Sequence, residues 1–153
     1  LKLRNGWVSC GPEVSRRVVE QMGMKGLVQA YGLSEASPNV CMSRHDDDLE
    51  KRIEGWAHIL DGVEVRLVDP ETGAVQLPGH TGEIQVRGWS VMKGYYKMPE
   101  QTAKAIDADG WLHTGDLGVM DDEGRLKFIT RIKDMFRVGG ENVAPAEVED
   151  VLH

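Results

Sequence analysis

The sequence has few of the features that mark secreted, metal-binding or membrane-spanning proteins. It contains two cysteines among 153 residues, Cys10 and Cys41, and they do not form the close pair that a zinc site uses. No stretch approaches the roughly 18 consecutive apolar residues that a membrane-spanning helix needs, and no apolar signal sequence follows the first six residues. We therefore expect a reduced, cytoplasmic protein with no transmembrane segment.

Positive charge is also scarce. The chain carries 18 lysines and arginines against 25 aspartates and glutamates, which gives a formal net charge of −7, and no run of basic residues occurs. A nucleic-acid-binding surface needs a basic patch, so we do not expect nucleic acid as a partner. A hydrophobic share of 41% and a charged share of 28% are typical of a globular protein that buries a real core.

The first third of the chain shows a helical pattern. Residues 12–22 are predicted to form a helix, because Pro12 suits its first turn and Gly23 fits its C-terminal cap. Apolar residues recur every fourth position from Val14 to Met22, which predicts one apolar stripe along that helix.

From about residue 60 the period changes to two. Apolar and polar residues alternate in 63–67, 83–87 and 125–128, which predicts half-buried strands of an antiparallel sheet or small barrel. A short buried strand is also predicted over 26–30, and a short helix over 99–106, again with a proline at its start.

Three segments carry side chains suited to nucleotide chemistry. In 31–35, Tyr-Gly-Leu-Ser-Glu, a ring can stack on a purine, a hydroxyl can donate to a phosphate oxygen and a carboxylate can hold Mg²⁺. In 110–118, Asp116 stands among glycines and can accept hydrogen bonds from both ribose hydroxyls. In 131–145, a charged stretch precedes a glycine pair that permits close approach. The respective alternatives are a plain strand-to-loop turn, a turn with a solvated carboxylate, and a charged edge strand with a turn.

In this order, the three segments resemble the consecutive core motifs of the adenylate-forming (AMP-binding) superfamily, which includes acyl-CoA synthetases, luciferases and the adenylation domains of peptide synthetases. Residues 82–88 and 91–96 resemble a further motif of that family, and residues 8–12 resemble its Gly-Gly-Ala-Pro loop near the adenine. The resemblance covers nearly the whole chain. The stretch 139–143 favours the acyl-CoA synthetases of the fatty- and aryl-acid groups.

The resemblance implies an α/β fold with a β-rich part. Residues 1–130 would be the C-terminal portion of the large AMP-binding domain, in which an α/β subdomain ends near residue 59 and a small, distorted β-barrel covers 60–130. Residues 131–133 would be a hinge, and 134–153 would begin the small C-terminal α+β domain. The chain lacks an initial Met and stops inside an expected helix, so we expect a middle-to-late fragment of a longer enzyme.

The resemblance also implies roles for single positions near the adenine and the phosphates. Gly11 belongs to the loop near the adenine, and Tyr31 would stack on the adenine with Gly32 beside it. Ser34 stands where the family usually has Thr, so it keeps the hydroxyl for a phosphate contact. Glu35 would act in catalysis by helping to hold Mg²⁺.

Further roles fall in the second half of the chain. Asp116 would bind the ribose hydroxyls, and Arg131 would reach the ribose or a phosphate. Lys133 would be the catalytic hinge residue about which the small domain turns between two half-reactions. Gly139 and Gly140 would lie near the tunnel for the pantetheine arm of coenzyme A.

The implied activity joins a carboxylic acid to coenzyme A at the expense of ATP, with Mg²⁺ and through an acyl-adenylate. The sequence contains neither the family's upstream phosphate loop nor its downstream catalytic lysine, so we expect the chain alone to be inactive. Two alternatives stay open at this point. One is an adenylation domain that loads a carrier protein, and the other is a nucleotide-binding module without catalysis.

Other polar residues favour structural interpretations. The run 45–48, His-Asp-Asp-Asp, could bind a metal, but a solvated loop explains it better. Cys10 and Cys41 are expected to be structural. His58, His80 and His113 show no metal-ligand spacing, and of these only His113 is a candidate for lining the site, because it stands beside Thr114, Gly115 and Asp116.

Overall fold

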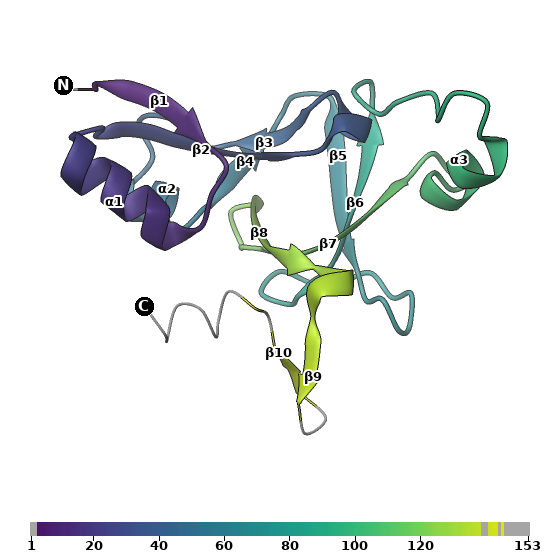
Figure 1. Cartoon of the computed structure of the whole chain (residues 1–153). Helices are drawn as coiled ribbons and strands as arrows, with labels where there is room; N and C mark the ends of the chain where they lie inside the picture. The colour runs from purple at the N-terminus through teal and green to yellow at the C-terminus, as the bar shows by residue number, and fades with distance from the viewer. Residues whose placement is uncertain (1–2, 139–140, 144, 146–153) are drawn as a thin grey trace.

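The computed structural model describes residues 3–138, 141–143 and 145 (Figure 1). The described part is a mixed α/β structure dominated by one large sheet. Its strands are β1 (Asn5–Val8), β2 (Gly26–Gly32), β3 (Asn39–Met42), β4 (Ala57–Ile59), β5 (Val63–Val68), β6 (Gly82–Gly88), β7 (Leu112–Met120), β8 (Arg125–Arg131), β9 (Phe136–Val138) and β10 (Glu141–Val143). Its helices are α1 (Pro12–Met22), α2 (Leu49–Ile53) and α3 (Pro99–Ala105), with the short 3₁₀ turns η1 (Ser34–Ala36) and η2 (Ile132–Asp134).

The large sheet has the order β1-β2-β3-β4-β8-β7-β6-β5. β1 runs parallel to β2, and every other neighbouring pair is antiparallel. β4 pairs with β8 through Ala57 opposite Leu126 and His58 opposite Arg125, and this ladder joins the two halves of the sheet. β9 and β10 form a separate antiparallel pair.

The pairing bears on the barrel expected for 60–130. Among the described strands, β1 and β5 are the free edges of the order, so no ladder closes residues 60–130 into a barrel. The ladder between β4 and β8 also crosses residue 60, where the end of an α/β subdomain is expected. A large mixed sheet is therefore confirmed, whereas the division of the chain at residue 59 and at 131–133 stays a prediction.

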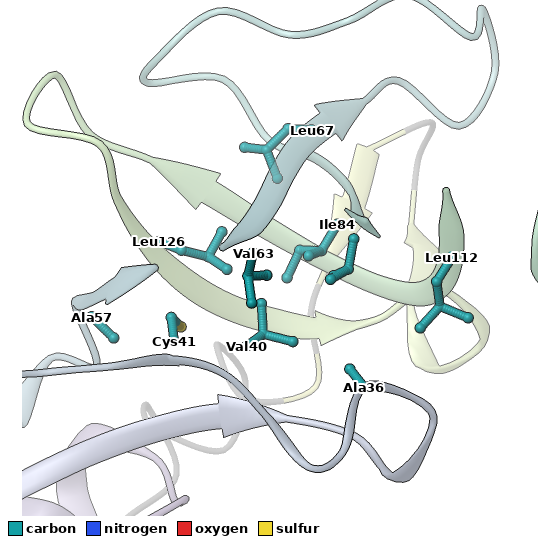
Figure 2. Close-up of a cluster of buried hydrophobic side chains, with 10 residues drawn as sticks. Ala36, Val40, Cys41, Ala57, Val63, Leu67, Ile84, Leu112 and Leu126 are labelled. Atoms are coloured by element: carbon teal, nitrogen blue, oxygen red, sulfur yellow. The ribbon is translucent and has the colours of Figure 1, made fainter. Parts of the chain in front are cut away.

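The strands from β3 to β8 share one apolar core, shown in Figure 2. The fully or nearly fully buried members are Ala36, Val40, Cys41, Ala57, Val63, Leu67, Ile84, Val86, Leu112 and Leu126. Ala36 belongs to η1, so this short turn is fixed to the core and not left as a free loop. The core thereby sets the position of the residues next to Ala36.

Helix α1 has the predicted bounds, with Pro12 in its first turn and Gly23 at φ 72° as its left-handed cap. The predicted apolar stripe, however, is not covered by the described residues, because Val14 and Met22 are 50% and 46% exposed. The buried residue of α1 is Ser15. The helix therefore packs inward through a hydroxyl, and its apolar positions remain on the surface of the described part.

The acidic run at 45–48 serves the fold. Asp48 accepts hydrogen bonds from the first backbone N–H groups of α2, and Asp47 lies 2.9 Å from Nε2 of His58. Arg52 is buried and donates to the carbonyl oxygens of Asp47 and Leu27, which ties α2 to β2. No cluster of three metal-ligating side chains occurs in residues 3–138, 141–143 and 145. These contacts give Asp47 and Asp48 structural roles at the start of α2.

Candidate functional site

A cavity of about 560 Å³ lies where the loop after β1 faces β2 and β8. The loop contributes Gly11, β2 contributes Tyr31 and β8 contributes Phe128 to its wall. Gly11 and Tyr31 come from two different sequence motifs, and the fold brings both to one cavity. The role of this cavity as a shared site of the two motifs stays a prediction.

A buried polar network fixes the loop that carries Gly11. Gln29 on β2 donates from Nε2 to the carbonyl oxygen of Cys10 at 3.1 Å and to the hydroxyl of Ser15. Ser15 in turn donates to the carbonyl oxygen of Gly11 at 3.0 Å. Because Gln29 and Ser15 are both buried, these bonds are shielded from water. They fix the backbone of the loop at Cys10 and Gly11 relative to β2.

Tyr31 connects the cavity to Asp116. Its hydroxyl donates to Oδ2 of Asp116 at 2.9 Å, and its ring stacks on Phe128 with centroids 5.6 Å apart and planes 14° apart. Burial and the nearby carboxylate raise the pKa of Tyr31 well above its usual value, so its hydroxyl stays protonated and acts as a donor. Phe128 covers part of one ring face, and both rings line the cavity.

Asp116 is buried in β7, and only 3% of its surface is exposed. The alternative of a solvated carboxylate in a turn is therefore wrong. In the part of the chain that the structure describes, Oδ1 of Asp116 has no hydrogen-bond donor; Nε of Arg131 lies 3.4 Å from it as an ion pair. Burial raises the pKa of Asp116, and this outweighs the opposing effects of Tyr31 and Arg131.

The pair Asp116 and Arg131 is set by strand register. The two residues are opposite each other on β7 and β8, and the register shifts beyond Leu117 at a β-bulge. Such bulges re-aim side chains near functional sites. Arg131 is exposed, so its guanidinium can reach a ligand while it remains beside Asp116.

Gly32 ends β2 at a second bulge, between Tyr31 and Gly32. A Cβ at this position would overlap the backbone carbonyl of Pro38, so only glycine allows the two segments to approach. The family role expected for Gly32, beside the adenine, remains untested. The structure gives the residue a physical task, because the close approach shapes the turn that leads to η1.

Ser34 and Glu35 lie on η1, with Ser34 exposed and Glu35 half-buried. Oε1 of Glu35 accepts a hydrogen bond from the hydroxyl of Tyr95 at 2.9 Å, and the backbone oxygen of Glu35 accepts from the N–H of Met92 at 2.8 Å. Mg²⁺ prefers oxygen ligands and is held in nucleotide sites by one or two carboxylates together with phosphates and waters. A single fixed carboxylate fits that habit, whereas a metal site built from protein groups alone does not exist among the described residues.

The remaining expected positions are only partly described. Lys133 lies exposed in η2, just after the end of β8. Gly139 and Gly140 lie outside the described residues, and of the helix expected after Pro145 only Pro145 itself is described. The hinge role of Lys133 and the coenzyme A contacts of the glycine pair stay predictions.

Sequence reasoning missed two contributors to the site. Phe128 was placed in a half-buried strand, yet it lines the cavity beside Tyr31. Tyr95 was noted as part of a motif, but its bond to Glu35 spans 60 positions and has no local signal. His113, by contrast, lies 3.1 Å from Oε2 of Glu83 and outside the cavity wall.

The profile of the family described as AMP-binding enzyme matches residues 6–96, which include the Gly11 loop, Tyr31 and the Glu35 turn. The chain belongs to this family. The expected resemblance to adenylate-forming acyl-CoA synthetases is thereby confirmed, and the matched residues run from β1 to the end of β6 and beyond it to residue 96.

Relatives of this chain are named as acyl-CoA synthetases or ligases. YngI of Bacillus subtilis (strain 168), provisionally named an acyl-CoA synthetase, is 46% identical over 144 residues, which are 94% of this chain and 26% of YngI. The mitochondrial medium-chain acyl-CoA ligase ACSF2 of Bos taurus is 40% identical over 142 residues, which are 93% of this chain and 23% of the relative. The ATP-bound crystal structure of MatB from Rhodopseudomonas palustris is 34% identical with a TM-score of 0.83, and the match covers 97% of this chain and 29% of MatB.

The chain thus spans about a quarter of the length of the curated relatives it matches. One relative is named as mitochondrial, so the cytoplasmic location expected from the sequence stays a prediction. Within residues 3–138, 141–143 and 145, no helix is long and apolar enough to cross a membrane.

Proposed function

We propose that this chain forms the adenosine-binding part of an enzyme that activates a carboxylic acid with ATP and transfers the acyl group to coenzyme A. The single observation that carries the proposal is the buried Oδ1 of Asp116, which lacks a hydrogen-bond donor among the described residues. A buried carboxylate oxygen without a donor is costly in a folded protein. Two ribose hydroxyls would supply donors at this point.

The neighbouring groups suit the rest of an adenosine. Tyr31 and Phe128 line the same cavity as the loop that carries Gly11, so their aromatic rings offer a stacking partner for the adenine. Arg131 lies next to Asp116 with its guanidinium exposed, where it can meet a ribose oxygen or a phosphate. Ser34 presents an exposed hydroxyl that can donate to a phosphate oxygen.

The proposed reaction has two steps. In the first, a carboxylate oxygen of the substrate attacks the α-phosphorus of ATP, and the bond to the pyrophosphate oxygen breaks. In the second, the thiolate of coenzyme A attacks the acyl carbon, and AMP leaves. Positioning and stabilisation of phosphate charge are the main demands of such transfers. A bound Mg²⁺, held in part by Glu35, would neutralise phosphate charge.

The second step involves the C-terminal part of the chain. In this proposal Lys133 marks the hinge about which the small domain turns, and Gly139 with Gly140 approaches the pantetheine arm. η2 supports a pivot in this position, because a single 3₁₀ turn separates the long β8 ladder from the separate β9 and β10 pair. The names of the relatives favour coenzyme A over a carrier protein as the acceptor.

Calorimetric titration of the 153-residue chain with AMP and with MgATP tests the adenosine site. We expect both to bind, and we expect Asp116→Ala to weaken AMP by about 10- to 100-fold, the range that corresponds to losing hydrogen bonds to a charged group. Asp122→Ala is the matched control, because Asp122 is exposed in the turn just beyond β7. Equal AMP affinity for the Asp116 variant and the control would refute the assignment.

Catalysis is a separate matter. We expect the 153-residue chain to release no pyrophosphate from ATP with any acid supplied, because the family's two lysine-bearing segments are not part of this sequence. A coupled pyrophosphate assay checks this, with a complete acyl-CoA synthetase as the positive control. Steady pyrophosphate release by the chain would show that residues within it are enough for the first step.

A further inference from the structure

The loop over residues 91–98 holds Glu35 at two points. The N–H of Met92 donates to the backbone oxygen of Glu35 at 2.8 Å, and the hydroxyl of Tyr95 donates to its carboxylate at 2.9 Å. Among the described residues, Tyr95 is the one side chain that hydrogen-bonds to this carboxylate. The bond uses one lone pair of Oε1, so Oε2 stays available to a ligand.

Tyr95 is itself fixed by helix α3. Its backbone N–H donates to Oγ1 of Thr102 at 2.9 Å, and the Thr102 hydroxyl donates to the carbonyl oxygen of Met98 at 2.9 Å. Gly94 has φ 142°, and a Cβ there would come within 2.6 Å of the Thr102 side chain. Glycine is therefore required just before Tyr95, and the close contact with Thr102 fixes the backbone position of Tyr95.

These contacts form a continuous path from α3 to the carboxylate. The helix fixes the backbone of Tyr95, the ring spans to η1, and the hydroxyl sets the orientation of the Glu35 carboxylate. Ala36, the next residue, is fully buried in the core, so the backbone of η1 is also fixed. A half-buried glutamate otherwise populates several rotamers. Binding an ion in one geometry selects one of them, which costs side-chain conformational entropy.

We propose that Tyr95 is a positioning residue that orients the Glu35 carboxylate toward the magnesium ion of bound MgATP. This inference rests on the proposed function. It assigns to the 91–96 motif a part in handling the metal, although no residue of that motif lines the adenosine cavity. A purely structural clamp is the competing interpretation, and the two differ in what they predict for ligands without a metal.

The experiment compares two ligands on the full 153-residue chain. AMP is titrated without metal, and ATP is titrated at a series of Mg²⁺ concentrations. For Tyr95→Phe we expect unchanged AMP affinity and a rise of about 3- to 10-fold in the Mg²⁺ concentration that gives half of the tightening of ATP, the range that corresponds to one hydrogen bond. Tyr96→Phe is the matched control, because Tyr96 is 85% exposed and undergoes the same loss of one oxygen.

A second variant guards against loss of fold. Thr102→Val removes the acceptor of the Tyr95 N–H and keeps the Tyr95 hydroxyl, so it loosens the tyrosine without deleting the group that binds Glu35. We expect it to shift the Mg²⁺ dependence in the same direction, with AMP affinity again unchanged. Glu35→Gln should abolish most of the Mg²⁺ effect, and adding Tyr95→Phe to it should change little more.

The outcomes separate the inference from the proposed function. A wild-type chain that binds neither AMP nor ATP would overturn both. A wild-type chain that binds ATP with no tightening by Mg²⁺ would overturn the magnesium role of Glu35 and this inference, but leave the adenosine site standing. A normal Mg²⁺ dependence in Tyr95→Phe and Thr102→Val, or an equal weakening of AMP, would overturn the inference alone.

Discussion

The two ends of the β7–β8 hairpin use the same pair of residue types in opposite ways. At the turn, Asp121 faces Arg125, with Oδ2 and Nε 2.7 Å apart. At the far end, Asp116 faces Arg131, with Oδ1 and Nε 3.4 Å apart. Both carboxylates are largely removed from water, yet their environments shift their pKa values in opposite directions.

At the turn, the carboxylate is well satisfied. Oδ1 of Asp121 accepts from the N–H groups of Glu123 and Arg125, and Oδ2 accepts from the Arg125 side chain. Burial by itself would raise the pKa of Asp121, but these bonds to Arg125 and to the backbone lower it below its usual value. At the far end, burial dominates and raises the pKa of Asp116. The carboxylate of Asp121 is fully hydrogen-bonded within the chain and has a structural role. Oδ1 of Asp116 has no donor among the described residues, so it can still accept a hydrogen bond from a ligand.

The largest expected effect comes from a substitution that disturbs both ends of the β7–β8 hairpin. Leu126 lies on β8 between them, is fully buried, and belongs to the shared core in Figure 2. We expect Leu126→Ala to lower the free energy of unfolding by about 2–5 kcal/mol, because the cavity it leaves loses packing as well as apolar burial. Urea denaturation measures this, and Leu77→Ala is the matched control because Leu77 is 72% exposed. A loss no greater than that of the control would show that the sheet does not depend on this core.

The next prediction concerns the turn end of the hairpin alone. Asp121→Asn removes a charge from a paired, little-exposed site and leaves Arg125 without its full partner. We expect the free energy of unfolding to fall by about 1–3 kcal/mol while AMP affinity stays unchanged. Asp122→Asn, one position along in the same turn, should alter neither quantity. A fall in AMP affinity for Asp121→Asn would mean that the two ends are coupled.

A smaller effect lies in the pH dependence of stability. The folded pKa of Asp121 is lowered, so its contribution is present above the unfolded pKa and is lost as pH falls through the folded value. The folded pKa of Asp116 is raised, so its contribution is lost as pH rises from about 4 through the folded value. Relative to wild type, the stability of Asp116→Asn should therefore increase as pH rises through the window of Asp116, whereas that of Asp121→Asn should decrease as pH rises through the window of Asp121. Denaturation curves over about pH 3 to 7, a range that brackets the ordinary carboxyl pKa values, check both slopes. Slopes of one sign for the two variants would contradict the contrast.

The smallest expected effect is a difference in reactivity between the two cysteines, one buried in the core and one beside the cavity. Burial in the core raises the pKa of the Cys41 thiol to about 12, so little thiolate forms at neutral pH. Cys10 is only partly buried and lines the cavity. We expect iodoacetamide to modify Cys10 well before Cys41 and AMP to slow the reaction at Cys10, as followed by peptide mass spectrometry. Modification of Cys41 first in the folded chain would contradict the placement of β3.

Local signals in the sequence were enough for several elements. Helix α1 was predicted with its observed bounds because Pro12 and Gly23 mark its two ends through the backbone alone. β5, β6 and β8 were predicted from alternation, and α3 was placed within one residue of its observed end. These elements share a signal that is written within a few neighbouring residues.

Other features depend on distant partners. β1, β3, β4 and α2 are three to five residues long, too short to show a period. The resemblance named Tyr31 and Asp116 as site residues, but their direct hydrogen bond joins positions 85 apart and follows only from the sheet order. For the same reason neither the ladder between β4 and β8 nor the strand order of the sheet could be predicted from the sequence.

That ladder has a consequence for how the chain acquires its shape. The β1–β4 part meets the β5–β8 part through the pairs Ala57–Leu126 and His58–Arg125, which lie more than sixty positions apart along the chain. During synthesis β4 cannot pair with β8 until residues 125–131 have been made. Contacts between residues so far apart in the sequence slow folding. β8 therefore joins the two parts of the sheet, and the cavity between β2 and β8 can form only when both of these strands are in place.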